Sequence, residues 1–162
     1  MSRIFEQWVE EYQDQAWSLA RYLLKDAAEA EDVCQESFVK LWHQQDSIDH
    51  DKVKAWLMKV TRNGCLDRLR RRKPTEELGE WHASADRDGP SEGAEQLQMG
   101  QLLQRGIDRL DEPYRSLVML RDVQQNSYEE VADALELSLA QVKVYLHRAR
   151  KQLRESLAEV RP

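Results

Sequence analysis

The sequence has few of the residues that interrupt or crosslink a chain: among 162 residues there are 6 Gly, 4 Pro and 2 Cys. Scarce Gly and Pro, together with frequent Leu, Ala, Glu, Gln and Arg, favour helices over sheet. The predicted fold class is therefore all-α. The length allows one ordinary domain or two small helical ones, and length alone does not decide between them.

Long apolar runs are also missing. No window approaches the roughly 18 continuous apolar residues of a membrane span, and the start, MSRIFEQWVEEYQ, lacks the apolar core of a secretory signal. The sequence therefore predicts a cytoplasmic protein with no membrane insertion of its own.

Signals for metal binding or catalysis are absent as well. Cys34 and Cys65 lie far apart with no Cys-x-x-Cys pair, and the histidines have no metal-ligand spacing, so both cysteines are predicted to be buried thiols. A redox role for Cys34 is a weaker hypothesis, because its inward face disfavours a thiolate. No phosphate-cradling Gly loop and no nucleophile with a motif-placed His is present. We predict no enzymatic activity, no cofactor and no metal.

The charges are segregated along the chain, although the net charge of -6 by itself argues against a nucleic-acid partner. Residues 53–73 hold eight basic side chains against the single acid Asp67, whereas residues 26–36 hold five acids and residues 74–100 hold seven. This separation predicts two kinds of partner surface, one for phosphates and one for a basic protein.

A stretch with Pro74, Gly79, Pro90 and Gly93 has no apolar period, which predicts a flexible linker over residues 74–95. The linker would separate one helical domain over residues 1–73 from a second over residues 96–162.

Apolar periodicity predicts three helices in the first domain, over residues 4–23, 27–43 and 52–72. The inward face of the second helix carries Val33, Cys34, Phe38, Leu41 and Trp42, and the opposite face carries Asp32, Glu36, Val39 and His43. Asp49 or Asp51 is expected to cap the third helix. In that helix we assign Trp56 to the core. Its polar stripe consists of Lys59, Asn63, Asp67 and Arg70.

The second domain is predicted to contain a helix-turn-helix. A first helix carries Leu97, Leu102, Leu103, Ile107 and Leu110, and Pro113 opens the next. Ser127 and Glu130 form a capping box for a helix over residues 128–135, and Ser138 caps a helix over residues 139–157. Val142, Leu146, Ala149 and Leu153 form the inner stripe of this last helix. Its outer face carries Lys143, Val144, His147, Arg148, Lys151 and Arg154.

Taken alone, a basic outer face fits an ordinary solvated helix as well as it fits DNA contact. The capped helix and short turn before it favour DNA. Two other classes stay open on the residues alone. One is a repressor or activator that uses only the helix-turn-helix, and the other is a structural helical adaptor whose basic stripes face solvent.

Three ordered segments resemble the extracytoplasmic-function (ECF) sigma factors of the sigma-70 family. They are AEAEDVCQESFVKLW, VKAWLMKVTRNGCLDRLRRRK and LDEPYRSLVMLRDVQQNSYEEVADALELSLAQVKVYLHRARKQLRESL. The resemblance covers residues 5–157 in the family's order. It implies a factor that directs promoter-specific initiation in response to stress or an envelope signal. The implied partners are core RNA polymerase, promoter DNA and an anti-sigma factor.

The resemblance also implies site residues. Core polymerase binding falls on Asp32, Gln35 and Glu36. The residues implied to melt and recognise the minus-ten element are Lys59, Arg62, Asn63, Asp67, Arg70 and Arg71. The loop over residues 44–51 is implied to help hold an extruded base. Recognition of the minus-thirty-five element falls on Tyr128, Gln141, Lys143, Val144, His147, Arg148 and Lys151.

The chain departs from the family pattern in two places. Glu136 occupies a turn position where the family usually has Gly, and Ala140-Gln141 and Val144-Tyr145 stand where Gly-Thr and Ser-Arg are more usual. The promoter sequence read by the family therefore does not transfer. We expect modest affinity for the minus-thirty-five element, because Tyr145 replaces an Arg.

Overall fold

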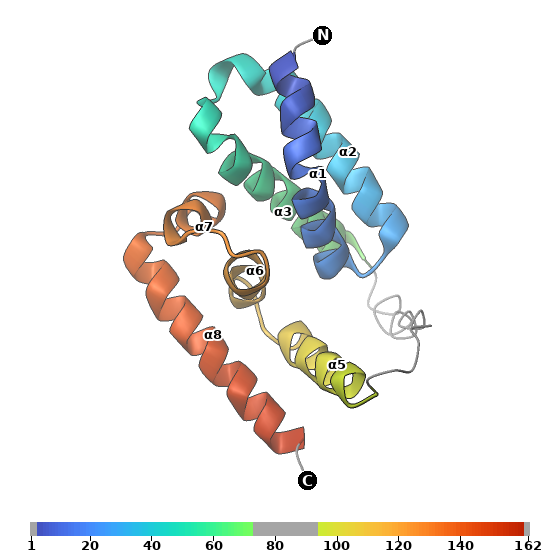
Figure 1. Ribbon diagram of the computed structural model, residues 1–162, viewed down its shortest axis with the longest axis vertical. Coiled ribbons are helices and arrows are strands. Elements are labelled where there is room, and N and C mark those ends of the chain that lie inside the picture. Colours follow the sequence, from blue (N-terminus) through green and yellow to red (C-terminus); the bar gives the residue numbers. More distant parts are fainter. Residues whose placement is uncertain (1–2, 73–93, 161–162) are drawn as a thin grey trace. The chain divides into compact units, whose positions relative to one another are not determined.

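The computed structural model describes residues 3–72 and 94–160, which contain helices and turns and no strand. The predicted all-α fold class is confirmed (Figure 1). The chain divides into two compact units, the first holding α1 to α3 and the second holding α5 to α8. The expected linker over residues 74–95 lies outside the described residues, apart from Ala94 and Glu95, with which α5 begins.

The first unit is a bundle of three mutually packed helices, α1 (Arg3–Leu24), α2 (Ala27–Gln44) and α3 (Val53–Arg71) (Figure 1). The chain turns between α1 and α2 because Lys25 adopts a left-handed conformation with φ 62°. Asp26 then caps α2, accepting the Glu29 N–H at 2.9 Å. The fully buried core side chains include Leu19, Leu23, Val33, Leu41 and Leu57.

The connection from α2 to α3 consists of two short 3₁₀ turns, Gln45–Ser47 and His50–Lys52. The predicted capping of α3 by Asp49 or Asp51 is wrong. Lys52 is the N-cap residue, and no side chain caps the helix. The 3₁₀ turn takes the place of a capping side chain, and Asp49 contributes its backbone carbonyl, which accepts the Lys52 N–H at 2.9 Å.

Two tryptophans of the first unit differ in burial. Trp56, which was assigned to the core, is half-buried and packs against a buried cluster of Trp8, Leu41 and Val53. Trp42 was expected to point inward but is 39% exposed. It packs edge-on against Phe5, with ring centroids 5.0 Å apart. Trp42 lies in the last turn of α2, close to the start of α1.

In the second unit the long helix α8 (Leu139–Val160) packs against α5 (Ala94–Asp108), α6 (Tyr114–Leu117) and α7 (Tyr128–Leu135) (Figure 1). A π-helical turn, Val118–Val123, follows α6 directly. Pro113 is the N-cap of α6 rather than its first helical residue. Leu103, part of the predicted apolar pattern of α5, is 42% exposed, whereas Ile107, one turn later on the same face, is buried.

Candidate nucleic-acid interface

The polar face of α2 is tied to α3 by an ion pair. Nη2 of Arg68 lies 2.9 Å from Oε2 of Glu36, and its Nη1 lies 3.9 Å from Oδ2 of Asp32. Both carboxylates remain largely exposed, at 61% for Glu36 and 63% for Asp32. Gln35, between them in sequence, is exposed as well. The structure therefore brings the three residues together on one open acidic face, as predicted.

A second arginine closes the same end of the bundle. Nη2 of Arg72 donates to the Leu24 carbonyl and to Oε1 of Glu29, each at 2.9 Å. Its side chain is only 15% exposed, so this contact joins the end of α3 to α1 and α2 in a partly dry setting. Sequence reasoning missed the roles of Arg68 and Arg72, since both partners lie more than thirty residues away.

The polar stripe of α3 forms on the surface as predicted. Asn63 is exposed, and Lys59 and Arg62 are half-buried. Asp67 forms a close ion pair with Arg70 and lies 4.0 Å from Nη2 of Arg71. The Arg70 and Arg71 side chains are 72% and 79% exposed. Asp67 thus lowers the net positive charge of this face, while the Arg70 and Arg71 side chains remain exposed to solvent.

The helix-turn-helix has the predicted caps and core. In α7 the Ser127 side chain accepts the Glu130 N–H at 3.0 Å while the Glu130 side chain accepts the Ser127 N–H at 2.9 Å. Val142, Leu146, Ala149 and Leu153 are all buried on the inner side of α8. The turn between the helices holds Glu136 in a left-handed conformation with φ 57°. A Gly, the family's usual residue there, adopts this conformation at lower cost.

Five of the residues expected to contact the minus-thirty-five element are exposed on the outer side of α8: Lys143, Val144, His147, Arg148 and Lys151. Gln141 is exposed too, but its side chain is engaged. Its Oε1 accepts the Ser138 N–H at 2.9 Å, and Ser138 Oγ accepts the Gln141 N–H at 3.1 Å.

Two cations lie near the ring of Tyr128, at the start of α7. The guanidinium carbon of Arg121 is 4.3 Å from the ring centroid, and Nζ of Lys143 is 5.9 Å from it. Arg121 also donates to the Asn126 carbonyl at 2.8 Å. The role of Arg121 was not foreseen, because the π-helical turn that presents it has no recognisable sequence signal.

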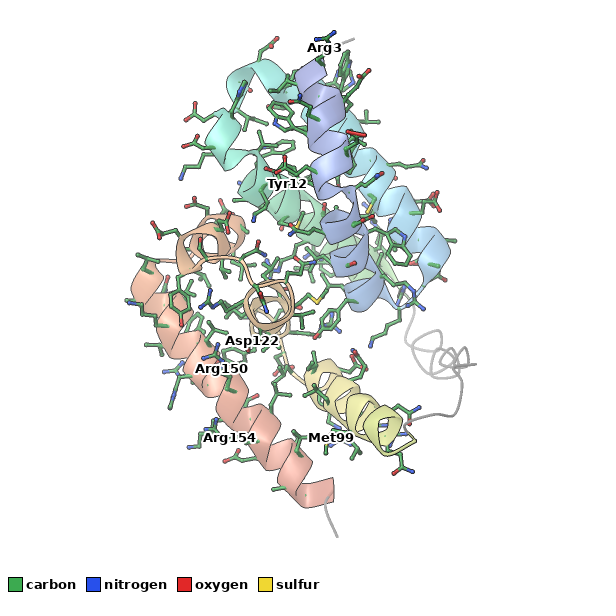
Figure 2. The ribbon with its side chains drawn as sticks, in the orientation of Figure 1. Arg3, Tyr12, Met99, Asp122, Arg150 and Arg154 are labelled. Carbon is green, nitrogen blue, oxygen red and sulfur yellow. The ribbon has the colours of Figure 1, made fainter. Side chains whose placement is uncertain are left out.

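A further ion pair fixes the middle of α8 within the second unit. Arg150 donates to both carboxylate oxygens of Asp122, at 2.6 and 3.2 Å, and Figure 2 shows the two side chains side by side. This hydrogen bonding raises the pKa of the Arg150 guanidinium. The pair holds the π-helical turn against the same helix that carries the exposed basic residues.

Other chemistry finds little support in the parts of the chain that the structure describes. Residues 3–72 and 94–160 hold no group of three or more potential metal-binding side chains, and none of their helices is long and apolar enough to cross a membrane. Cys34 and Cys65 are both buried, as predicted. Burial, with Glu31 nearby, raises the pKa of the Cys34 thiol to about 11, which disfavours a reactive thiolate.

Both units match known families. Residues 8–75 match the family model of Sigma-70 region 2, and residues 100–153 match that of Sigma-70, region 4. The "RNA polymerase sigma-E factor" of Streptomyces avermitilis is 37% identical, over 94% of this chain and 84% of its own length. The "ECF RNA polymerase sigma factor SigM" of Bacillus subtilis is 31% identical, over 88% of each chain.

The chain belongs to the sigma-70 family, in its ECF group. As an ECF sigma factor it directs promoter-specific transcription initiation with core RNA polymerase. Matches to both units leave no place for a repressor that uses only the helix-turn-helix, or for a purely structural adaptor.

Solved structures agree with this fold. CnrH, in a complex with the cytosolic domain of CnrY, has a TM-score of 0.73 and 25% identity, over 97% of this chain and 89% of its own. The sigma factor RpoE of Bartonella quintana, in a complex with the anti-sigma factor NepR, has a TM-score of 0.71 at 23% identity. It covers 99% of this chain and all of its own, and it supports the fold alone.

Proposed function

We propose that the ECF sigma factor divides its work among three helical faces. Residues 1–73 bind core polymerase and open the minus-ten element, and residues 96–162 read the minus-thirty-five element. The observation that carries this division is that α2, α3 and α8 each expose a charged or polar face behind a buried apolar stripe. The α2 face is acidic, whereas the α3 and α8 faces are rich in cations.

The polymerase-binding face is proposed to comprise Asp32, Gln35 and Glu36. The two carboxylates are exposed by more than half, so a basic partner can reach them. Arg68 of α3 lies 2.9 Å from Glu36 and 3.9 Å from Asp32, so it links this face to the neighbouring helix.

The minus-ten face is proposed to comprise Lys59, Arg62, Asn63, Asp67, Arg70 and Arg71. Asn63 is the best single candidate for a base contact, because it is exposed and its amide both donates and accepts hydrogen bonds. Arg70 and Arg71 supply positive charge for the backbone of an opened strand. Trp56 is half-buried against the cluster of Trp8, Leu41 and Val53, so we assign it a packing role rather than a stacking role.

The minus-thirty-five face is proposed to comprise Tyr128, Gln141, Lys143, Val144, His147, Arg148 and Lys151. Cationic side chains on α8 suit phosphate contacts, and the exposed Val144 suits a thymine methyl group in the major groove. We propose that Arg121 joins this face by stacking on Tyr128 and fixing its ring.

We also propose where the protein acts and how it is regulated. The factor acts in the cytoplasm, as a non-enzymatic initiation factor that responds to stress or an envelope signal, and an anti-sigma factor holds it until the signal arrives. CnrH, which is 25% identical to this chain, was solved in a complex with the cytosolic domain of CnrY, and this supports a protein partner for the factor. Co-expression with the products of neighbouring genes tests it: a stable heterodimer is expected, and its absence for every neighbour would contradict the anti-sigma part.

A direct test of the division of labour is promoter binding by holoenzyme made from core polymerase and this chain. The free chain should bind duplex promoter poorly, whereas the holoenzyme should bind tightly and in a salt-sensitive manner. Tight duplex binding by the free chain, unchanged when polymerase is added, would contradict the proposal.

A further inference from the structure

The first turn of α8 is closed by a capping box that resembles the one on α7. In each box a Ser hydroxyl accepts a backbone N–H from three residues ahead, and a side-chain oxygen of that residue accepts the Ser N–H. The boxes differ in one respect. The residue that reaches back is Glu130 on α7 and Gln141 on α8, so the first is a carboxylate and the second a neutral amide.

The capping box uses the carbonyl oxygen of the Gln141 amide and leaves its NH₂ group outside the box. A backbone N–H only donates, so the amide atom that meets Ser138 is the carbonyl oxygen. The NH₂ group, which only donates, is left for another partner. A glutamine that reads adenine uses its oxygen and its nitrogen together. While the box is closed, Gln141 lacks the free acceptor that this bidentate contact requires.

The position of Gln141 places it with the outer side chains of α8. Gln141, Val144 and Arg148 are separated by three and four residues, so they share one face of the helix, and all three are exposed. The NH₂ group therefore belongs to the surface that we propose reads the minus-thirty-five element.

We infer, on the basis of that proposed function, that Gln141 is a donor-only contact to promoter DNA. Its Oε1 holds the start of α8, and its NH₂ donates to a hydrogen-bond acceptor of the DNA, either a phosphate oxygen or the acceptor edge of a base. This explains the choice of an amide. A glutamate would close the box equally well, but it would remove the donor and bring a negative charge toward the phosphates.

The test uses holoenzyme reconstituted from core polymerase and the full chain. The probes are a promoter duplex selected by the wild-type holoenzyme from a randomised library and the same duplex with its minus-thirty-five element scrambled. Gln141→Glu retains the capping oxygen and loses the donor, whereas Gln141→Ala loses both. Glu130→Gln makes the reverse exchange in the other box and serves as the matched control.

We expect Gln141→Glu to melt at or above the wild-type temperature and to bind the intact promoter at least about tenfold more weakly. If the acceptor is a base, the loss should vanish on the scrambled duplex, whereas a phosphate acceptor should leave a loss there as well. Gln141→Ala should melt lower and bind weakly, and Glu130→Gln should not weaken binding. An equal loss on all selected promoters assigns the acceptor to a phosphate, and a changed preference at one base pair assigns it to that base. Both results support the inference.

Two results would overturn it. Gln141→Glu could bind the intact promoter as well as the wild type does, which would show that the donor is not used. It could instead melt as low as Gln141→Ala, which would show that a side-chain oxygen does not close the box. If the wild-type holoenzyme selects no promoter at all, the proposed function itself fails, and this is a different observation from a loss confined to the variant.

Discussion

Arg68 on α3 lies with its Nη2 2.9 Å from Oε2 of Glu36 on α2. A residue of the helix proposed to contact DNA is thus already paired with a residue proposed to bind polymerase. The Arg68 side chain is 27% exposed and that of Glu36 is 61% exposed, so the pair is open to solvent. Such pairs contribute only about 0–1 kcal/mol to folding. The importance of Glu36 is therefore expected to show in binding rather than in stability.

A charge exchange separates the two possible roles of Glu36. We predict that Glu36→Arg weakens binding to core polymerase by roughly tenfold or more, because it repels a basic partner. The double variant Glu36→Arg with Arg68→Glu restores an ion pair with the charges reversed. It should regain wild-type thermal stability but not polymerase affinity, as measured by fluorescence anisotropy of the labelled chain.

Arg68→Glu alone is the control, because it breaks the same pair while leaving Glu36 in place. It should bind polymerase more tightly than the double variant does. Recovery of full affinity by the double variant would mean that Glu36 serves only to hold Arg68.

Asn63→Ala should impair promoter opening and spare polymerase binding. Asn63 is exposed on α3, so truncation leaves the core intact, while a lost base contact slows melting by about tenfold or more. Permanganate footprinting of the opened strand measures the effect. Gln101→Ala, which removes an exposed amide on α5, is the control and should open the promoter at the wild-type rate. Loss of polymerase binding by Asn63→Ala would contradict the assignment.

Glu136→Gly should stabilise the second unit. Glu136 has φ 57°, a conformation that costs an L-residue roughly 1 kcal/mol and a glycine little. We expect a gain of about 0.5–1 kcal/mol in the free energy of unfolding, from urea titration followed by circular dichroism. Glu136→Ala removes the carboxylate but keeps the backbone cost, so it should give no such gain. An equal gain from both variants would point to the charge rather than to the backbone.

Cys34 should react slowly near neutral pH. Burial raises the pKa of its thiol to about 11, so the protonated, unreactive form dominates at pH 7 and the thiolate accumulates only as the pH approaches that value. Iodoacetamide labelling followed by peptide mass spectrometry should show an alkylation rate that keeps rising above pH 9. Rapid alkylation of Cys34 in the native protein at pH 7 would revive the redox hypothesis.

The apolar periodicity of the sequence predicted the helices and most of their buried side chains. In α8, for example, Val142, Leu146 and Ala149 recur at helical spacing, and all three are buried. The periodicity failed at Trp42 and Leu103, which lie on apolar faces that extend past their covering neighbours. Whether such a side chain is covered depends on where the adjacent helix begins or ends, and the repeat of one helix does not contain that information.

Some contacts of the candidate site cannot be predicted from the spacing of residues within one helix. The pairing of Arg68 with Glu36 joins residues 32 positions apart, so it depends on how α2 packs against α3. The box between Ser138 and Gln141 was accessible, since it has the same three-residue spacing as Ser127 and Glu130. The sequence predicts a cap at Ser138 and a DNA contact at Gln141, and the structure shows that the two residues form one box.

Run-off transcription tests the central claim most directly. Core polymerase is supplied with this chain and with promoter duplexes recovered from a randomised library, and the 5′ ends of the transcripts are mapped. The account predicts one defined start site on each recovered promoter, with the yield falling sharply when either the minus-ten or the minus-thirty-five element is scrambled. Transcripts without a defined start, or a yield indifferent to both elements, would contradict it.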